Sequence, residues 1–189
     1  MSRILAFAGS TREASVNKKL VRIAEETVRE AGGDVTCIDL RDFPMPIYDG
    51  DLEAAQGPPE NATKLYEPMK EHQGLLLACP KYNSSITGVL KNTIDWVSRP
   101  RDEEPPLAAF TGKVAALSTS PGALGGLRGL VHVRAILGNI GVIVLPNQVT
   151  VSHAFDAFGD DDSLKDARLR ERVVRLAVEL VETTRKLSP

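Results

Sequence analysis

The chain has 189 residues, and its 25 Asp and Glu side chains nearly balance its 23 Lys and Arg side chains, giving a formal net charge of −2. This balance argues against a nucleic-acid binder, which would carry a basic excess or patch. Hydrophobic residues at 42% and charged residues at 25% exclude a disordered chain, and two cysteines are too few for a disulfide scaffold.

Apolar, strand-like runs alternate with helical periodicity along the chain. The expected strands are residues 3–9, 35–40, 74–79, 113–118 and 142–145. The expected helices are residues 17–31, 61–72 (capped by Asn61), 88–98 and 127–139, followed by a last amphipathic helix that a capping box of Ser163 and Asp166 would open. Residues 41–59 are expected to form a long loop, and residues 100–106 a surface connection.

This alternation predicts an α/β fold, with a five-stranded parallel sheet between two helical layers and one domain over residues 1–189. Two doubly wound strand orders fit the pattern, the Rossmann half and the flavodoxin-like order 2-1-3-4-5, and periodicity does not choose between them. The N-terminus lacks the apolar region of a signal peptide, and no apolar run is long enough to span a bilayer. A cytoplasmic protein without a membrane partner is therefore expected.

Three polar or glycine-rich segments leave the carboxyl ends of expected strands, at residues 9–17, 80–88 and 118–126. Ligands of open α/β sheets bind beyond these strand ends, at the point where the strand order reverses. In the order 2-1-3-4-5 the three strands concerned are neighbours. The three segments would then meet in one cleft.

The first segment leads into a helix N-terminus and carries the side chains of Ser10, Thr11, Arg12, Ser15 and Asn17. Free backbone N–H groups, the helix dipole and these donors together suit a phosphate group. A purely structural role, in which Ser15 caps the helix, fits the same residues equally well.

The second segment offers Tyr82 as a flat apolar wall and Asn83 as an amide that can read ring nitrogens and carbonyls. The alternative is an Asn-Ser turn that caps the next helix, with Tyr82 covering an edge of the core. The glycines of the third segment would let backbone approach a ligand closely, which alone is weak support.

Several familiar sites are excluded by residue identity. Thr11 and Ala14 stand where a dinucleotide-binding loop needs its second and third glycines, and there is no Gly-Lys-Ser/Thr or Gly-x-Ser-x-Gly motif. A phosphatase loop beginning at Cys79 would need Arg at the position of Ser85. The three histidines are isolated in sequence, so neither a catalytic acid or base nor a metal site is expected.

Taken together, the segments form a pattern that is far more specific than any one of them. Three motifs follow one another: Gly9-Ser10-x-Arg12-x-x-Ser15-x-Asn17, then Pro80-x-Tyr82-Asn83, then Gly88-x-Leu90-Lys91-Asn92-x-Ile94-Asp95-Trp96-x-Ser98-Arg99. With the Pro44 to Asp49 stretch and Gly125-Gly126 also in place, residues 3 to about 150 resemble the NAD(P)H-dependent FMN reductase family, which includes quinone, chromate and azo-dye reductases. The Leu-Lys-Asn-x-x-Asp-Trp string is the most specific part.

The resemblance implies a flavodoxin-like fold that binds one FMN per subunit. The FMN phosphate would lie on Ser10, Arg12, Ser15 and Asn17. The isoalloxazine ring would lie against Pro80, Lys81, Tyr82 and Asn83, with Ser84 and Ser85 beside it and Ser118, Ser120 and Gly122 near its other edge. Lys91, Asn92 and Asp95 would stabilise a loop and a subunit interface. The expected assembly is a homodimer or homotetramer formed through the helix that begins near Gly88.

The expected reaction is ping-pong hydride transfer from NADPH or NADH to flavin N5 and on to a small acceptor: a quinone, a free flavin, a metal oxyanion or an azo compound. Whether FMN stays bound or leaves after reduction is open, and a non-catalytic electron carrier resembling flavodoxin is the alternative. Two residues depart from the family pattern. Lys81 stands where many relatives carry Glu, and Thr87 where relatives often have Pro. Lys81 suits an anionic substrate or the charge of reduced flavin, or else disturbs a subunit contact.

Overall fold

A computed structural model describes residues 1–101, 103–120 and 126–188. Its central sheet is parallel and has the order β2-β1-β3-β6-β7. These strands are β1 (Arg3–Ala8), β2 (Asp34–Cys37), β3 (Gly74–Ala78), β6 (Val114–Thr119) and β7 (Ile143–Thr150). The remaining two strands, β4 (Lys81–Tyr82) and β5 (Ser85–Ile86), pair only with each other in a small hairpin. Counted within the sheet, the order is 2-1-3-4-5, which confirms the flavodoxin-like alternative.

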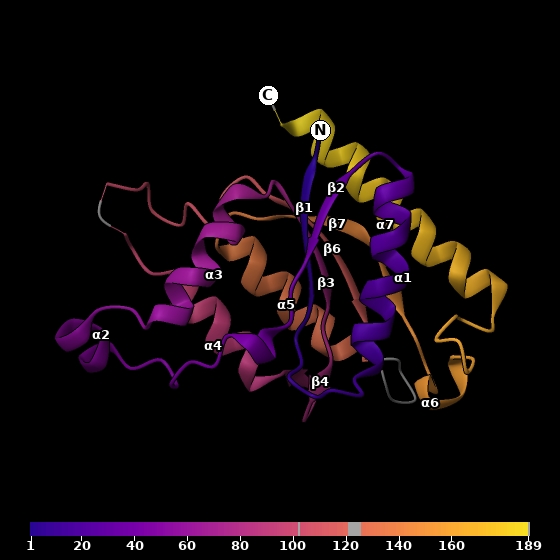
Figure 1. Cartoon of the computed structure of the whole chain (residues 1–189), viewed down its shortest axis with the longest axis horizontal. Coiled ribbons are helices and arrows are strands. Elements are labelled where there is room, and N and C mark those ends of the chain that lie inside the picture. The colour runs from indigo at the N-terminus through magenta and orange to yellow at the C-terminus, as the bar shows by residue number, and fades with distance from the viewer. Residues whose placement is uncertain (102, 121–125, 189) are drawn as a thin grey trace.

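Helices cover both faces of the sheet (Figure 1). One face packs against α1 (Val16–Glu30) and α7 (Ala167–Leu187), and the other against α3 (Glu60–Glu71), α4 (Gly88–Val97) and α5 (Leu127–Asn139). Alternation along β1 divides its side chains between the two cores, with Ile4 and Ala6 toward α1 and Leu5 and Phe7 toward α3 and α4. All five residues of β3 are buried, as in a central parallel strand.

The expected loop at residues 41–59 contains two short helices. A 3₁₀ helix spans Leu40–Asp42, and α2 spans Gly50–Gln56, where the Asp49 carboxylate accepts hydrogen bonds from the first-turn N–H groups. No residue of α2 is buried, so the sequence has no apolar periodicity there to reveal the helix. The segment projects from the body of the molecule as an arm, at the left of Figure 1.

Two expected helix caps are wrong. Pro59, not Asn61, occupies the N-cap of α3, and the Asn61 amide instead donates to the carbonyl of Pro44 at 2.8 Å, which holds the arm. Asp166 itself caps α7 by accepting from the backbone N–H groups of Arg168 and Leu169. Ser163 lies outside that helix in a turn with Asp161, so it does not open a capping box.

The last strand is longer than its expected range of residues 142–145. β7 runs on past Pro146 because its pairing with β6 shifts register between Ala115 and Leu117. At this edge of the sheet the guanidinium of Arg134 donates to the carbonyls of Val144 and Leu145. A proline is tolerated on an edge strand, where it removes no essential ladder hydrogen bond. A short helix, α6 (Ala154–Ala157), follows.

Candidate active site

The described parts of the three segments singled out in the sequence lie together at the carboxyl ends of β1, β3 and β6. Gly9 N–H donates to the Ala78 carbonyl at 2.9 Å, and Cys79 N–H donates to the Ser118 carbonyl at 2.8 Å, so the pairing of the strands continues into the loops. Figure 1 shows β4, part of the second segment, at the end of the molecule opposite both chain termini. This is the edge of the sheet at which open α/β folds bind ligands.

The first segment presents donors that the protein itself does not use. Ser15 occupies the N-cap position of α1 with extended backbone, yet its side chain accepts no hydrogen bond from the helix. The first turn of α1 contains no acidic residue, and no carboxylate of the described residues lies within 4.0 Å of the exposed Arg12 guanidinium. Ser10 is buried, and its hydroxyl accepts from Arg12 N–H at 3.3 Å. Ser15 therefore does not play the capping role, and the donor set fits an anion such as a phosphate.

Asn17 behaves differently from its neighbours in this segment. Its side chain is buried, its amide nitrogen donates to the Ser120 carbonyl at 2.6 Å, and its amide oxygen accepts from Ser120 N–H at 3.1 Å. Both ends of the amide are thus engaged by the third segment. Asn17 fixes the spacing between the first and third segments.

Thr87, which stands where relatives often have Pro, makes a second buried connection between segments. The Thr87 hydroxyl donates to the Gly9 carbonyl at 2.6 Å and accepts from Leu90 N–H at 3.2 Å, so it joins the first segment to the second and also caps α4. A proline, which has no side-chain hydroxyl, cannot make either bond. The sequence marked Thr87 as unusual but gave no sign of this partner.

The side chains that open the third segment, from Ser118 to Ser120, point into the protein. The hydroxyl of Ser118 donates to Leu77 O at 3.4 Å, and that of Ser120 donates to Val151 O at 3.2 Å. Thr119, which sequence reasoning did not single out, is fully buried and donates to the Cys79 carbonyl. Gly122, expected in the same segment, lies outside the described residues.

The second segment presents an exposed aromatic ring. Tyr82 is 53% exposed at the tip of the β4–β5 hairpin, whereas Pro80 before it is buried. Tyr82 therefore does not cover an edge of the core, as the structural alternative required. The two turn residues, Asn83 and Ser84, have φ of 49° and 66°, the left-handed backbone that short hairpin turns require.

The Leu-Lys-Asn-x-x-Asp-Trp string serves as an anchor for the projecting arm. The Asn92 side chain accepts from Tyr48 N–H at 2.8 Å and donates to Pro46 O at 2.9 Å, and the Trp96 indole donates to the same carbonyl at 2.8 Å. The Tyr48 ring meets Trp96 edge-on at 5.0 Å, and the Arg99 guanidinium lies over the Tyr48 ring at 5.0 Å. These contacts give the string a structural function.

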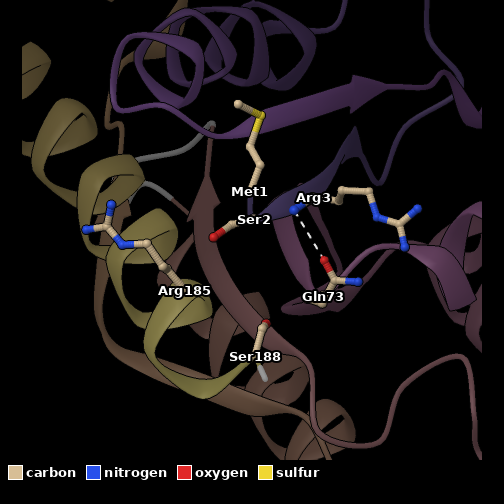
Figure 2. A pocket seen from close by; sticks show the side chains of 6 residues that line it. All are labelled: Met1, Ser2, Arg3, Gln73, Arg185 and Ser188. Carbon is tan, nitrogen blue, oxygen red and sulfur yellow. Dashed lines mark hydrogen bonds between the residues drawn. The ribbon is translucent and has the colours of Figure 1, made fainter.

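A separate depression of about 430 Å³ lies at the opposite end of the sheet, near the chain termini. Figure 2 shows its lining, in which Arg3 N–H donates to the Gln73 side chain at 3.2 Å and the guanidinium groups of Arg3 and Arg185 point away from one another. They do not converge on a common ligand. Within the described residues no group of three or more His, Cys, Asp or Glu side chains is placed to hold a metal ion. Within the same residues, no helix is long and apolar enough to cross a membrane.

Comparison with known proteins shows the family of the chain. A family model described as NADPH-dependent FMN reductase matches residues 2–156. The chain belongs to this family. It is 35% identical over 173 residues to an NAD(P)H-dependent FMN reductase of Pseudomonas aeruginosa, covering 90% of this chain and 89% of the relative. It is 33% identical over 145 residues to a quinone reductase of Escherichia coli, covering 76% and 73%.

A solved structure supports the same assignment. The flavoenzyme NAD(P)H:(acceptor) oxidoreductase FerB of Paracoccus denitrificans superposes with a TM-score of 0.77 at 25% identity, covering 97% of this chain and 98% of that one. The chain is therefore an FMN-dependent oxidoreductase that takes electrons from NAD(P)H. Relatives named as reductases favour this enzyme over the electron-carrier alternative. The unused donors beside the N-terminus of α1 fit the phosphate of FMN.

Proposed function

We propose that the protein is an NAD(P)H:quinone oxidoreductase that binds one FMN across the three loops at the carboxyl ends of β1, β3 and β6. The observation that supports this proposal is that available hydrogen-bond donors on one loop occur together with an exposed aromatic ring on the next loop. Ser15 and Arg12 lie at the start of α1, and Tyr82 lies on the neighbouring loop. The phosphate would bind to Ser10, Arg12 and Ser15 and to the first N–H groups of α1, with Asn17 positioning the loop.

The isoalloxazine ring would lie against the second loop, from Pro80 to Ser85. Tyr82 would form one wall of the ring site, and the Asn83 amide would meet polar atoms of the ring edge. Backbone N–H groups of the turn at Asn83 and Ser84 would stabilise negative charge that develops on the ring. Ser118, Ser120 and Gly122 remain proposed at the other edge. Since the hydroxyls of Ser118 and Ser120 are engaged internally, these two would contribute backbone atoms.

Bound FMN would supply the ring that accepts a hydride and passes on two electrons. The protein's task is to hold that ring so that the nicotinamide reaches it from the open side beside Tyr82, which is 53% exposed. Donor and acceptor would use the same open side in turn, so ping-pong kinetics follow. NAD(P)H, a quinone and one solvent proton give NAD(P)⁺ and a hydroquinone, so the balance requires no protein acid or base.

A permanently bound FMN is favoured over one that is released after reduction. Two buried ties, Asn17 to Ser120 and Thr87 to Gly9, join the described parts of the site through the protein's own hydrogen bonds. A site ordered in this way loses less entropy when it binds its ligand. Slow dissociation of reduced flavin during turnover supports this proposal, and transfer of reduced flavin to an acceptor in a separate dialysis chamber contradicts it.

A homodimer or homotetramer formed through α4 is also proposed. The arm held by α4 carries Ile47, which is 85% exposed, and an isoleucine so exposed is suited to a subunit contact. Sedimentation of the wild type and of Ile47→Asp tests this. The cytoplasm remains the proposed location because NAD(P)H is the electron donor, and one domain over residues 1–189 remains the proposed unit.

The function itself is tested in anaerobic solution. The protein is loaded with FMN, excess flavin is removed, and NADPH or NADH is added while the visible flavin absorbance is followed. The proposal expects rapid bleaching, and recovery of the absorbance when a quinone is added. Flavin that stays oxidised with both coenzymes contradicts the reductase. Bleaching without recovery contradicts the quinone as acceptor. If FMN does not stay bound, free FMN replaces it as the substrate of the same assay.

A further inference from the structure

The β4–β5 hairpin rests on the first half of α5. Gly129 makes the approach possible, because a Cβ atom there would lie 3.0 Å from the Lys81 Cβ. Arg128 Nη1 donates to the Ser84 hydroxyl at 3.4 Å, and the Ser85 hydroxyl and His132 Nδ1 share a hydrogen bond of 2.8 Å. Arg128, Gly129 and His132 of α5 therefore contact the hairpin that carries Tyr82. This contact region between α5 and the hairpin is called the junction below.

The junction holds two cations without a counter-ion. Within residues 1–101, 103–120 and 126–188, neither Lys81 nor Arg128 has a carboxylate oxygen within 4.0 Å. Lys91, by contrast, is paired with Asp95 at 2.7 Å. Lys81 is half-buried beside α5, so it is less completely hydrated than a lysine on an open surface. Two positive charges on one junction attract anions that approach this side of the loop.

We propose that Lys81 and Arg128 form a cationic edge of the acceptor site that favours electron acceptors carrying a sulfonate or carboxylate over neutral acceptors of the same shape. The inference rests on the proposed function, since it requires the acceptor to stack beside Tyr82. The aromatic part of the acceptor would lie on the open side of the ring site. Its anionic group would then reach the Lys81 ammonium and the Arg128 guanidinium. Ser84 supports the Arg128 side chain through its hydroxyl.

This edge determines specificity and takes no part in the electron transfer. A charge-assisted contact to an anionic substituent stabilises the bound acceptor and leaves the reacting carbonyls untouched. The effect is therefore expected in the ratio of kcat/KM for the charged acceptor to kcat/KM for the neutral one, because any change in how the loop holds FMN affects both acceptors alike. Salt should weaken it, because Arg128 is exposed and Lys81 is only half-buried.

The test compares 1,2-naphthoquinone-4-sulfonate with 1,2-naphthoquinone as acceptors of the FMN-loaded enzyme, with NADPH as donor. The variants are Lys81→Glu, Lys81→Gln and Arg128→Gln. Lys186→Glu is the control, since it makes the same change in net charge on an exposed residue in the last turn of α7. The end of α7 lies near the chain termini and away from β4 (Figure 1).

We expect Lys81→Glu to lower the sulfonate-to-neutral ratio of kcat/KM on the order of tenfold, the size of one charge-assisted contact. Lys81→Gln and Arg128→Gln should lower it less, Lys186→Glu should leave it unchanged, and added salt should lower the wild-type ratio. A ratio that is the same in the wild type and all the Lys81 and Arg128 variants overturns the inference. A wild type that reduces neither quinone overturns the proposed function instead. Should Lys81→Glu lose FMN, the two Gln variants decide.

Discussion

The side-chain amide of Asn17 is joined to the backbone of Ser120 by two hydrogen bonds, of 2.6 Å and 3.1 Å, across 103 residues of sequence. Both residues are buried, and this one side chain engages both backbone groups of Ser120. The bond pair connects the start of α1 to the loop after β6. It makes Asn17 a positioning residue for the phosphate site, one that is needed before any ligand binds.

Replacing Asn17 by Ala should therefore destabilise the protein without FMN. The backbone N–H and carbonyl of Ser120 would lose their partners, at a cost of about 1–3 kcal/mol. Urea unfolding of the flavin-free wild type and variant measures the difference. Equal stability of the two flavin-free proteins, with a loss seen only when FMN is present, would show that Asn17 acts as a direct ligand.

Thr87 should be the corresponding link between the first two loops. We expect Thr87→Val, which keeps the shape but removes the hydroxyl, to cost about 1–2 kcal/mol, because both the bond to the Gly9 carbonyl and the cap of α4 are lost. Thr87→Ser keeps the hydroxyl and should retain most of the stability. If Val and Ser variants unfold at the same urea concentration, the hydroxyl has no such role.

The hairpin turn offers a stabilising substitution. Ser84 has a φ of 66°, a left-handed conformation that costs an ordinary residue roughly 1 kcal/mol and glycine almost nothing. Ser84→Gly should therefore raise the midpoint of urea unfolding, although it also removes the hydroxyl that accepts from Arg128. Ser84→Ala, which removes the hydroxyl but keeps the Cβ, is the matched control. A glycine variant no more stable than the alanine variant would count against backbone strain at this turn.

Lys113 should give the stability of the fold a distinct pH dependence. It is buried just before β6, where its ammonium donates to the carbonyls of Lys70 and His72. Burial, with a smaller contribution from the charge of Arg3, lowers the pKa of Lys113 from 10.5 to about 8. Between these values the unfolded chain binds more protons than the folded protein, so this residue makes the fold more stable as pH rises.

The comparison with Lys113→Met isolates that contribution from those of other groups. We expect the unfolding free energy of the wild type, minus that of the variant, to increase from pH 8 to pH 10.5 by up to about 3 kcal/mol. Denaturant unfolding at a series of pH values provides the measurement. A difference that stays constant or falls over this interval would contradict the buried charge.

The sequence predicted the features that follow from strong local patterns. β3 is a continuous apolar run, and apolar residues recur at helical spacing along the buried face of α1. The three loops stand out because polar residues follow buried strands. What it missed depends on long-range partners or on weak patterns. The arm helix α2 buries no residue, so it leaves no periodic signal. The register shift of β7 depends on its pairing with β6. Arg134, which lies on α5, also donates to a carbonyl of β7.

In the candidate site, too, local features could be predicted from the sequence and long-range partners could not. Ser15 could be recognised as a donor at a helix start, but whether its hydroxyl caps the helix or stays available depends on backbone geometry. The partners of Asn17 and Thr87 lie 103 and 78 residues away, and no spacing rule connects them. Asn17 therefore looked like a phosphate ligand, while its amide is engaged by Ser120.

A flavin titration tests whether the loop from Ser10 to the start of α1 holds the FMN phosphate. FMN is titrated into flavin-free wild type, the double variant Arg12→Ala with Ser15→Ala, and Arg22→Ala, a control on an exposed position further along α1. We expect the double variant to bind FMN more weakly, with a loss of binding free energy of several kcal/mol at most, on the order of two charge-assisted contacts. Arg22→Ala should bind FMN like the wild type. Riboflavin, which lacks the phosphate, should bind both the wild type and the double variant equally. Unchanged FMN affinity in the double variant would show that this loop does not hold the phosphate.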